Sequence, residues 1–303
     1  MAHQESMTLA VLYERFPTEE SCRSYLYEKR WSKGFACPKC GVVDEPFKVV
    51  SRKLYQCKHC NHQTSVTAGT IMDKSRTPLR KWFLAIYLIS SDKRGCSALR
   101  LQRELGVAYG TAWTMSHKIR NAMKERDENY QLSGIIEIDE GFFGSPSEGA
   151  GKRGRGTDKA PVVVGLSLGE DGRPNFIKAR VLEKVDGASV AQFAKEAFQP
   201  GAVVSSDGLS VYNKLAESGF DHQPAKFNPK ENPEHLKWLH VVIGNLRAFL
   251  NGTYHGVPDK HLQAYTDEFC YRFNRRAWPE QLFARTITAC VHADPFTRHE
   301  LIA

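Results

Sequence analysis

Two aspartates at the ends of apolar runs are the residues of this sequence best suited to chemistry. Asp139 ends the run IIEID shortly before Gly141, and Asp207 ends the run AVVSSD directly before Gly208. Alternating β-branched residues predict a strand, and a glycine behind them predicts a turn. Carboxylate oxygens suit Mg²⁺ or Mn²⁺. Either aspartate alone is equally well explained as a solvated turn residue, but the pair predicts a divalent-metal site.

Two glutamates, Glu137 and Glu140, flank the first aspartate. Side chains alternate along a strand, so Glu137 has the same parity as Asp139. Glu137 is therefore either an assistant at the metal site or a structural strand residue.

Four cysteines form the most specific local pattern in the chain. Cys37 and Cys40 make one Cys-x-x-Cys knuckle, and Cys57 and Cys60 make a second one, separated from the first by 16 residues. This spacing is typical of a tetrahedral structural zinc site, here a zinc ribbon. The other four cysteines have apolar neighbours and are expected to pack in cores: Cys22, Cys96, Cys270 and Cys290.

Helical patterns surround and follow this ribbon. Thr18 is a candidate cap for a helix before it, and residues 78–89 form an apolar helix after it. Residues 97–107 and 109–120, with a glycine at 106, then predict a helix-turn-helix. Its second helix carries Lys118 and Arg120 on the polar face expected to enter a DNA major groove. Simple helix packing is the alternative explanation.

From residue 134 the pattern becomes rich in strands. Three strands joined as hairpins precede a helix, a strand, a helix, a strand and a long helix over about 233–250. This order matches an RNase H-like α/β domain with a mixed sheet. In that fold the first and fourth strands are neighbours, so Asp139 and Asp207 would converge.

The predicted fold class is thus a multi-domain α+β protein. Its expected parts are a helical lead-in and zinc ribbon (1–75), a helix-turn-helix region (76–132), the RNase H-like domain (133–280) and a C-terminal tail (281–303).

Charge points to an anionic partner. Lys and Arg exceed Asp and Glu by 42 − 34 = 8, and the isoelectric point is near 9.0. Further candidate phosphate contacts are Lys152, Arg153 and Arg155 in a glycine-rich loop, which is equally well explained as a solvated loop, and Arg275 and Arg276 in an aromatic run. No apolar run approaches the roughly 18 residues that cross a bilayer, and the N-terminus lacks a signal-peptide core, so we expect an intracellular protein without a membrane partner.

Three stretches together resemble a known family. They are the cysteine region with TAGT at 67–70, EIDE at 137–140, and GTYHGV at 252–257 running through KHL to DEFCYRFNRR at 267–276. The chain resembles zinc-ribbon insertion-sequence transposases of the DDE class, the IS1595 family with its ISXO2-like catalytic domain. The resemblance implies a bacterial cytoplasmic, nucleoid-associated enzyme that binds terminal inverted repeats and cuts and joins double-stranded DNA. It further implies two Mg²⁺ or Mn²⁺ ions on an acidic triad, and at least a dimer on DNA.

The third member of that triad departs from the common pattern. A glutamate is expected on the last long helix, but residues 238–247 contain no acid. Matching from the helix start places Asn245 in this position, and matching back from GTYHG places His240 there. Arg247 would then be the basic residue that the family often carries, and it is a further candidate DNA contact. We favour Asn245. His240 and Arg247 share one helix face, and Asn245 lies about 140° away from it.

Two other functions remain open at this stage. The missing acid would also fit a catalytically inactive, transposase-derived DNA-binding regulator. An RNase H-like nuclease acting on other nucleic acids is the third possibility.

Overall fold

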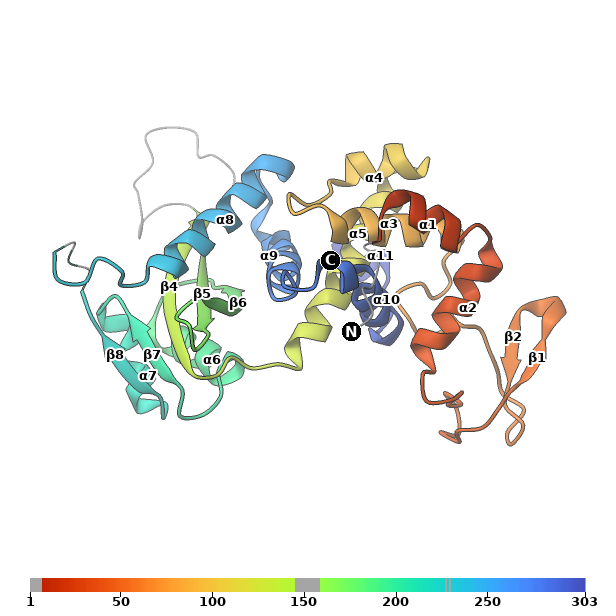
Figure 1. Cartoon of the computed structure of the whole chain (residues 1–303), viewed down its shortest axis with the longest axis horizontal. Helices are drawn as coiled ribbons and strands as arrows, with labels where there is room; N and C mark the ends of the chain where they lie inside the picture. The colour runs from red at the N-terminus through yellow and green to blue at the C-terminus, as the bar shows by residue number, and fades with distance from the viewer. Residues whose placement is uncertain (1–6, 145–158, 227, 229, 303) are drawn as a thin grey trace. The chain divides into compact units, whose positions relative to one another are not determined.

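The computed structural model describes residues 7–144, 159–226, 228 and 230–302. The chain divides into two compact units, the first comprising Met1–Arg126 with Trp278–Ala303 and the second Asp127–Ala277. Figure 1 colours both units by residue number. Among the residues that the structure describes, no helix combines the length and apolarity needed to cross a bilayer.

The first unit combines helices with a small antiparallel sheet. The sheet has the order β1-β2-β3, from strands β1 (Phe47–Val49), β2 (Leu54–Gln56) and β3 (Gln63–Thr64). The helices are α1 (Leu9–Arg15), α2 (Glu19–Arg30), α3 (Leu79–Ser91), α4 (Ala98–Leu105), α5 (Tyr109–Glu128), α10 (Leu282–His292) and α11 (Arg298–Ile302). Helix α10 packs against α2 and α3, so residues 282–292, expected in a tail, belong to this unit's core.

Helix ends in this unit are capped as their sequences require. Thr18 and Ser21 form a capping box at the start of α2, as expected for Thr18. Helix α3 follows Pro78, which offers no side-chain acceptor. Glu19 of α2 takes that role, because its carboxylate accepts the N–H groups of Leu79 at 2.9 Å and Arg80 at 3.0 Å.

The predicted helix-turn-helix is present as α4 and α5. Gly106 ends α4 with φ 57°, a left-handed conformation that suits glycine. Helix α5 is buried along much of its length, and Tyr109 in its first turn is 52% exposed.

The second unit is built on a five-stranded mixed sheet in the order β6-β5-β4-β7-β8. The strands are β4 (Ile135–Phe143), β5 (Ala160–Leu168), β6 (Pro174–Val181), β7 (Val203–Ser206) and β8 (Asp221–Pro224). The first three pair antiparallel, and β7 joins β4 in parallel. In chain order this is 3-2-1-4-5, so the first and fourth strands are neighbours and the predicted RNase H-like fold is confirmed.

Helices cover both faces of this sheet. Leu239, Val242 and Leu246 of α8 (Lys237–Tyr254) pack with Val162 and Val164 of β5 on one face, to which α9 (Asp259–Phe273) also contributes. On the other face, α6 (Gly187–Ala197) packs against residues that alternate with the first set: Ile136, Ile138 and Val163. Asp139 and Glu137 therefore lie on the α8 face of β4.

Side-chain amides of α9 and of the residue that follows it form hydrogen bonds with the backbone of the edge strand β6. Gln263 accepts the N–H of Val181 at 2.7 Å and donates to the carbonyl of Ala179 at 3.2 Å. Asn274, just after α9, accepts the N–H of Ile177 at 2.8 Å and donates to its carbonyl at 3.0 Å. Helix α9 thus satisfies backbone groups that an edge strand leaves open.

Two local expectations differ from the structure. The helix expected over 208–218 is a short 3₁₀ turn, η2 (Ser210–Tyr212), followed by one turn of helix, α7 (Lys214–Glu217). The long helix expected from about 233 begins at Lys237, because Leu236 adopts a left-handed conformation with φ 54°.

Candidate functional site

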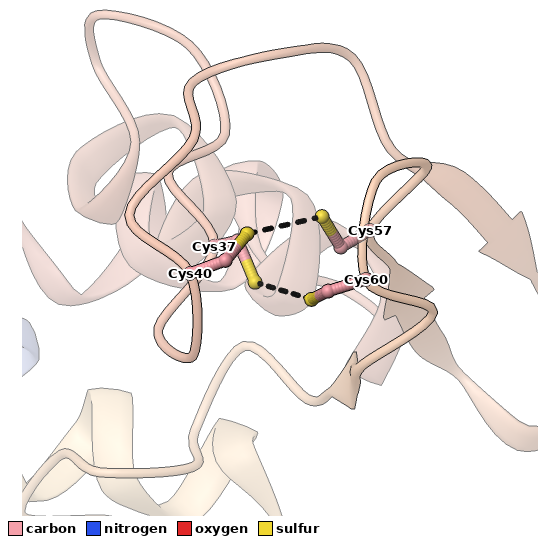
Figure 2. A group of neighbouring side chains, drawn as sticks. All are labelled: Cys37, Cys40, Cys57 and Cys60. Carbon is pink, nitrogen blue, oxygen red and sulfur yellow. Dashed lines mark hydrogen bonds between the residues drawn. The ribbon is translucent and has the colours of Figure 1, made fainter.

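The four cysteines of the ribbon converge on one point. Their sulfur atoms all lie within 4.8 Å of one another, with Cys37 and Cys60 at 3.6 Å and Cys40 and Cys57 at 3.7 Å. Figure 2 shows the four side chains turned toward one another from the two knuckles. A tetrahedral site with Zn–S bonds of about 2.3 Å places its sulfurs about 3.8 Å apart. The cysteines therefore fit a structural zinc ion.

The two knuckles share one local geometry. Four residues after the first cysteine of each, Gly41 (φ 72°) and Asn61 (φ 56°) are left-handed, and their N–H groups bond back to the Cys37 and Cys57 carbonyls at 2.9 and 3.0 Å. Burial raises the pKa of Cys37, but hydrogen bonds from backbone N–H groups and with the Cys60 and Cys40 side chains outweigh it and lower that pKa to about 6. A thiolate, the form that binds metal, is favoured there.

The other four cysteines are buried free thiols, as expected for packing residues: Cys22, Cys96, Cys270 and Cys290.

Asp139 lies in the middle of β4 rather than at its end. The strand continues past it to Phe143, paired throughout with β5, so the turn predicted at Gly141 is wrong. A Cβ on Gly141 would lie 2.6 Å from the Phe143 ring and 3.0 Å from Ile243 of α8. The glycine is needed for close packing of α8 on the strand, which sequence periodicity does not reveal.

Asp207 follows the last residue of β7, beside the same part of β4. The parallel register pairs Ile135 with Val203 and Glu137 with Ser205. The pairing ends at Glu137 and Ser205, two residues before each aspartate, and continuing the same register would place Asp207 opposite Asp139.

His240 of α8 contacts Asp139. A hydrogen bond joins its Nε2 to Asp139 Oδ2 at 3.2 Å. That bond, together with the negative charges of Asp139, Glu137 and Asp207, raises the pKa of His240, while burial opposes the shift. Its side chain is 54% exposed and that of Asp139 is 15% exposed, so the cluster is open on one side.

Helix α8 runs along β4 so that His240 meets Asp139, Ile243 meets Gly141, and the Arg247 guanidinium lies 5.6 Å from the Phe143 ring centre. Asn245, the residue favoured from sequence, is exposed on α8 and lies about 140° around the helix from His240. The structure brings His240, not Asn245, to Asp139.

The two flanking glutamates lie on opposite faces. Glu137 is 7% exposed and its Oε2 accepts the Leu239 N–H at 3.1 Å. Burial raises the pKa of Glu137, although that N–H and two histidines oppose the shift. Glu140, on the α6 face, accepts a hydrogen bond from the hydroxyl of Tyr212.

Three side chains near the aspartates were not singled out from sequence. Tyr212 is fully buried, and burial, with the charges of Glu140, Asp139 and Asp207, raises its pKa, so it stays a neutral phenol donor. His222 bonds Ser206 Oγ at 2.8 Å and His235 bonds the Ser206 carbonyl at 3.1 Å. No local motif marks them, because their partners are distant in sequence.

Four of the five predicted DNA contacts that the structure describes form hydrogen bonds or ion pairs within the protein. Arg120 is 1% exposed and donates to Ser116, and Arg275 is 6% exposed and pairs with Asp127 at 2.7 Å, so burial argues against a DNA role for either. Lys118 donates to the Ile71 carbonyl at 3.1 Å. Arg276 donates to the carbonyls of β6 residues. Arg247 is exposed, while Lys152, Arg153 and Arg155 lie outside the described residues.

Comparison with known proteins gives two family matches. Residues 131–274 match the ISXO2-like transposase domain, and residues 17–63 match the transposase zinc-ribbon domain. A curated relative, an uncharacterised protein in transposable element ISH50 of Halobacterium salinarum, is 29% identical over 219 residues, covering 67% of this chain and 71% of that protein.

Solved structures of Mos1 transposase are also similar. The Mos1 strand transfer complex has a TM-score of 0.30 and 12% identity, covering 69% of this chain and 74% of that one. The Mos1 paired-end complex with the left transposon end has a TM-score of 0.28 and 11% identity, covering 70% and 79%. These TM-scores are too low to support a fold assignment, so the RNase H-like fold is assigned from the strand order of the second unit. Two domain matches of one family, in order along the chain, and a relative from a transposable element show that this chain belongs to the zinc-ribbon IS1595 family of insertion-sequence transposases.

Proposed function

We propose that this chain binds the terminal inverted repeats of its element and catalyses metal-dependent strand cleavage and strand transfer. The observation that carries this proposal is the contact of His240 with Asp139 at 3.2 Å, on a strand whose parallel neighbour leads into Asp207. The family membership supports the same reaction class.

The donor types of these three side chains would suit a divalent cation. Asp139 and Asp207 offer carboxylate oxygens, and His240 offers an imidazole nitrogen in its neutral form. When bound, metal ions at such a site supply an activated nucleophile and stabilise the leaving oxygen of a phosphodiester. The side chain of His240 is 54% exposed, and Arg247, whose guanidinium lies 5.6 Å from the Phe143 ring on the same side of α8, offers an exposed cation for a substrate phosphate.

His240 is the third ligand in this proposal, in place of Asn245. Imidazole binds softer divalent ions better than it binds Mg²⁺, whereas a carboxylate suits Mg²⁺. We therefore expect Mn²⁺ to support cleavage better than Mg²⁺. A His240→Glu variant restores the acidic residue of the common triad and is expected to shift this preference toward Mg²⁺.

The testing experiment is cleavage and strand transfer on a labelled duplex carrying the element's own terminal repeat, with Mg²⁺ or Mn²⁺. Asp139→Ala and Asp207→Ala should lower cleavage by about a thousandfold or more. His240→Ala should lower it by about ten- to a hundredfold, and Asn245→Ala should change it by about twofold or less. Asp171→Ala, an exposed aspartate in the β5–β6 turn, is the matched control and should leave cleavage unchanged.

An inactive DNA-binding regulator is the second candidate, and one observation favours it: α8 carries no acidic residue between Lys237 and Tyr254. Specific binding of the repeat without cleavage in either metal would establish it. Cutting of RNA–DNA hybrids, or of DNA without end preference, would point to a different nuclease. Joining two element ends requires at least two copies on DNA, so a repeat-bound dimer is part of the proposal.

A further inference from the structure

The start of α8 lacks the local cap that helices normally have. Leu236 occupies the N-cap position, is 1% exposed and offers no side-chain acceptor. Leucine is among the poorest N-cap residues, because the first N–H groups of a helix need an oxygen acceptor. The backbone of Leu236 is also left-handed, with φ 54°. Something outside the helix must hold its first turn in place.

Glu137 supplies the missing acceptor from the sheet. Its Oε2 accepts the N–H of Leu239 at 3.1 Å, and Leu239 is the third residue of α8. This is the N–H that a local capping side chain would bind. A carboxylate at that end also matches the positive end of the helix dipole.

The position of this cap ties the helix to the metal site. Glu137 lies two residues before Asp139 on the same face of β4, and Leu239 directly precedes His240. Fixing the Leu239 N–H on Glu137 therefore fixes where His240 meets Asp139. His235, just before α8, adds a second attachment through the carbonyl of Ser206, the residue before Asp207.

We propose that Glu137 is a positioning residue of this site, a helix cap supplied by the carboxylate strand that holds His240 against Asp139. The proposal rests on the proposed function of Asp139, Asp207 and His240. It assigns Glu137 no direct contact with metal or substrate. What Glu137 must provide is a hydrogen-bond acceptor, and its charge is secondary.

The test compares Glu137→Gln, which keeps an acceptor oxygen, with Glu137→Leu, which removes it. Asp186→Ala is the matched control, because Asp186 caps α6 of the same unit by accepting the Ser189 N–H at 2.8 Å. Two quantities are measured on the full chain: hydrogen exchange of the Leu239 amide, and repeat cleavage in Mn²⁺. The first does not depend on catalysis.

Glu137→Leu should lose exchange protection at Leu239 and lower the maximal cleavage rate by about ten- to a hundredfold, as loss of residues that orient ligands does. Glu137→Gln should keep both within about threefold, because the amide oxygen still accepts. Asp186→Ala should lose protection at the start of α6 and keep cleavage.

Several outcomes overturn the proposal. Equal loss of cleavage in Glu137→Gln and Glu137→Leu would make the charge essential, as for a metal ligand. An equal loss of cleavage in Asp186→Ala would show that the loss in Glu137→Leu comes from general instability. A Leu239 amide that exchanges freely in the unmodified protein would exclude the cap even if Glu137→Leu fails to fold. If Asp139→Ala leaves cleavage intact, the proposed function fails, while the exchange data still decide whether Glu137 caps α8.

Discussion

The two candidate metal sites of this molecule are built in opposite ways. The ribbon site takes four thiolates from two short knuckles, closed around one point within 4.8 Å. The proposed aspartate site would take Asp139 from β4, Asp207 from just after β7 and His240 from α8, and the His240 side chain is 54% exposed. A closed set of four ligands leaves no coordination position for a substrate, whereas an open set does.

Because of this difference, we expect the ribbon site to contribute to folding stability and the proposed aspartate site to contribute to catalysis. The ribbon is small, so its metal contributes directly to folding. The aspartate site stands on a complete sheet with a core on each face, so its ligands are held by the fold whether or not metal is present. The predictions below test this separation.

The largest expected effect is loss of zinc. Chelation, or Cys57→Ser, should unfold the ribbon, because structural zinc contributes about 10 kcal/mol or more to such modules. Hydrogen exchange should increase over residues 35–64 while the sheet of the second unit stays protected. Cys22→Ala, at a buried cysteine outside the site, is the control and should keep its zinc. A ribbon that stays protected without metal would contradict the closed-site interpretation.

The second largest expected effect is loss of Mn²⁺ binding at the proposed aspartate site. Asp139→Asn with Asp207→Asn should weaken Mn²⁺ by about a hundredfold or more, since both charged ligands are lost. Calorimetry measures the affinity, and elemental analysis should find an unchanged zinc content. If zinc is lost as well, or if Mn²⁺ affinity persists, the two sites are not independent in the way described.

Two glycines give a smaller, paired comparison. Gly141→Ala should destabilise the second unit by about 1 to 3 kcal/mol, because the new methyl group would meet the Phe143 ring and Ile243 of α8. Gly41→Ala in the ribbon meets no atom within 4 Å, and its φ of 72° alone should cost about 1 kcal/mol. Urea unfolding of each variant measures both. A harmless Gly141→Ala would mean that α8 does not pack so closely on β4.

The smallest effect concerns protonation of His240. Its pKa is raised above 6.5 by the hydrogen bond to Asp139 and by nearby carboxylates. The stabilising contribution of the protonated pair is therefore fully present below about pH 6.5 and is lost as pH rises through the folded-state pKa. With chelator present, the stability difference between wild type and His240→Ala should shrink over that range, by under about 1 kcal/mol because His240 is half exposed. A difference that grows with pH would reverse the assigned sign.

Local patterns predicted what depends on local spacing. The cysteine knuckles and the order of strands followed from sequence because each knuckle is a short turn and each strand has its own periodicity. The turn predicted at Gly141 was wrong, and the burial of Arg120 and Arg275 was not foreseen, because the surroundings of all three residues come from distant segments. Sequence also did not reveal that α8 begins only after Leu236, with Glu137 accepting the Leu239 N–H and His240 beside Asp139.

The amides that cover β6 also bear on how two copies of this chain can meet. Gln263 and Asn274 already use backbone groups of residues 177, 179 and 181, so this edge has little left to offer an incoming strand. The opposite edge, β8, is four residues long and ends in Pro224, which has no N–H to donate. Within the described residues, both edges of this five-stranded sheet thus offer little to an added strand. If two copies assemble on DNA as proposed, we expect them to meet through surfaces other than these two edges.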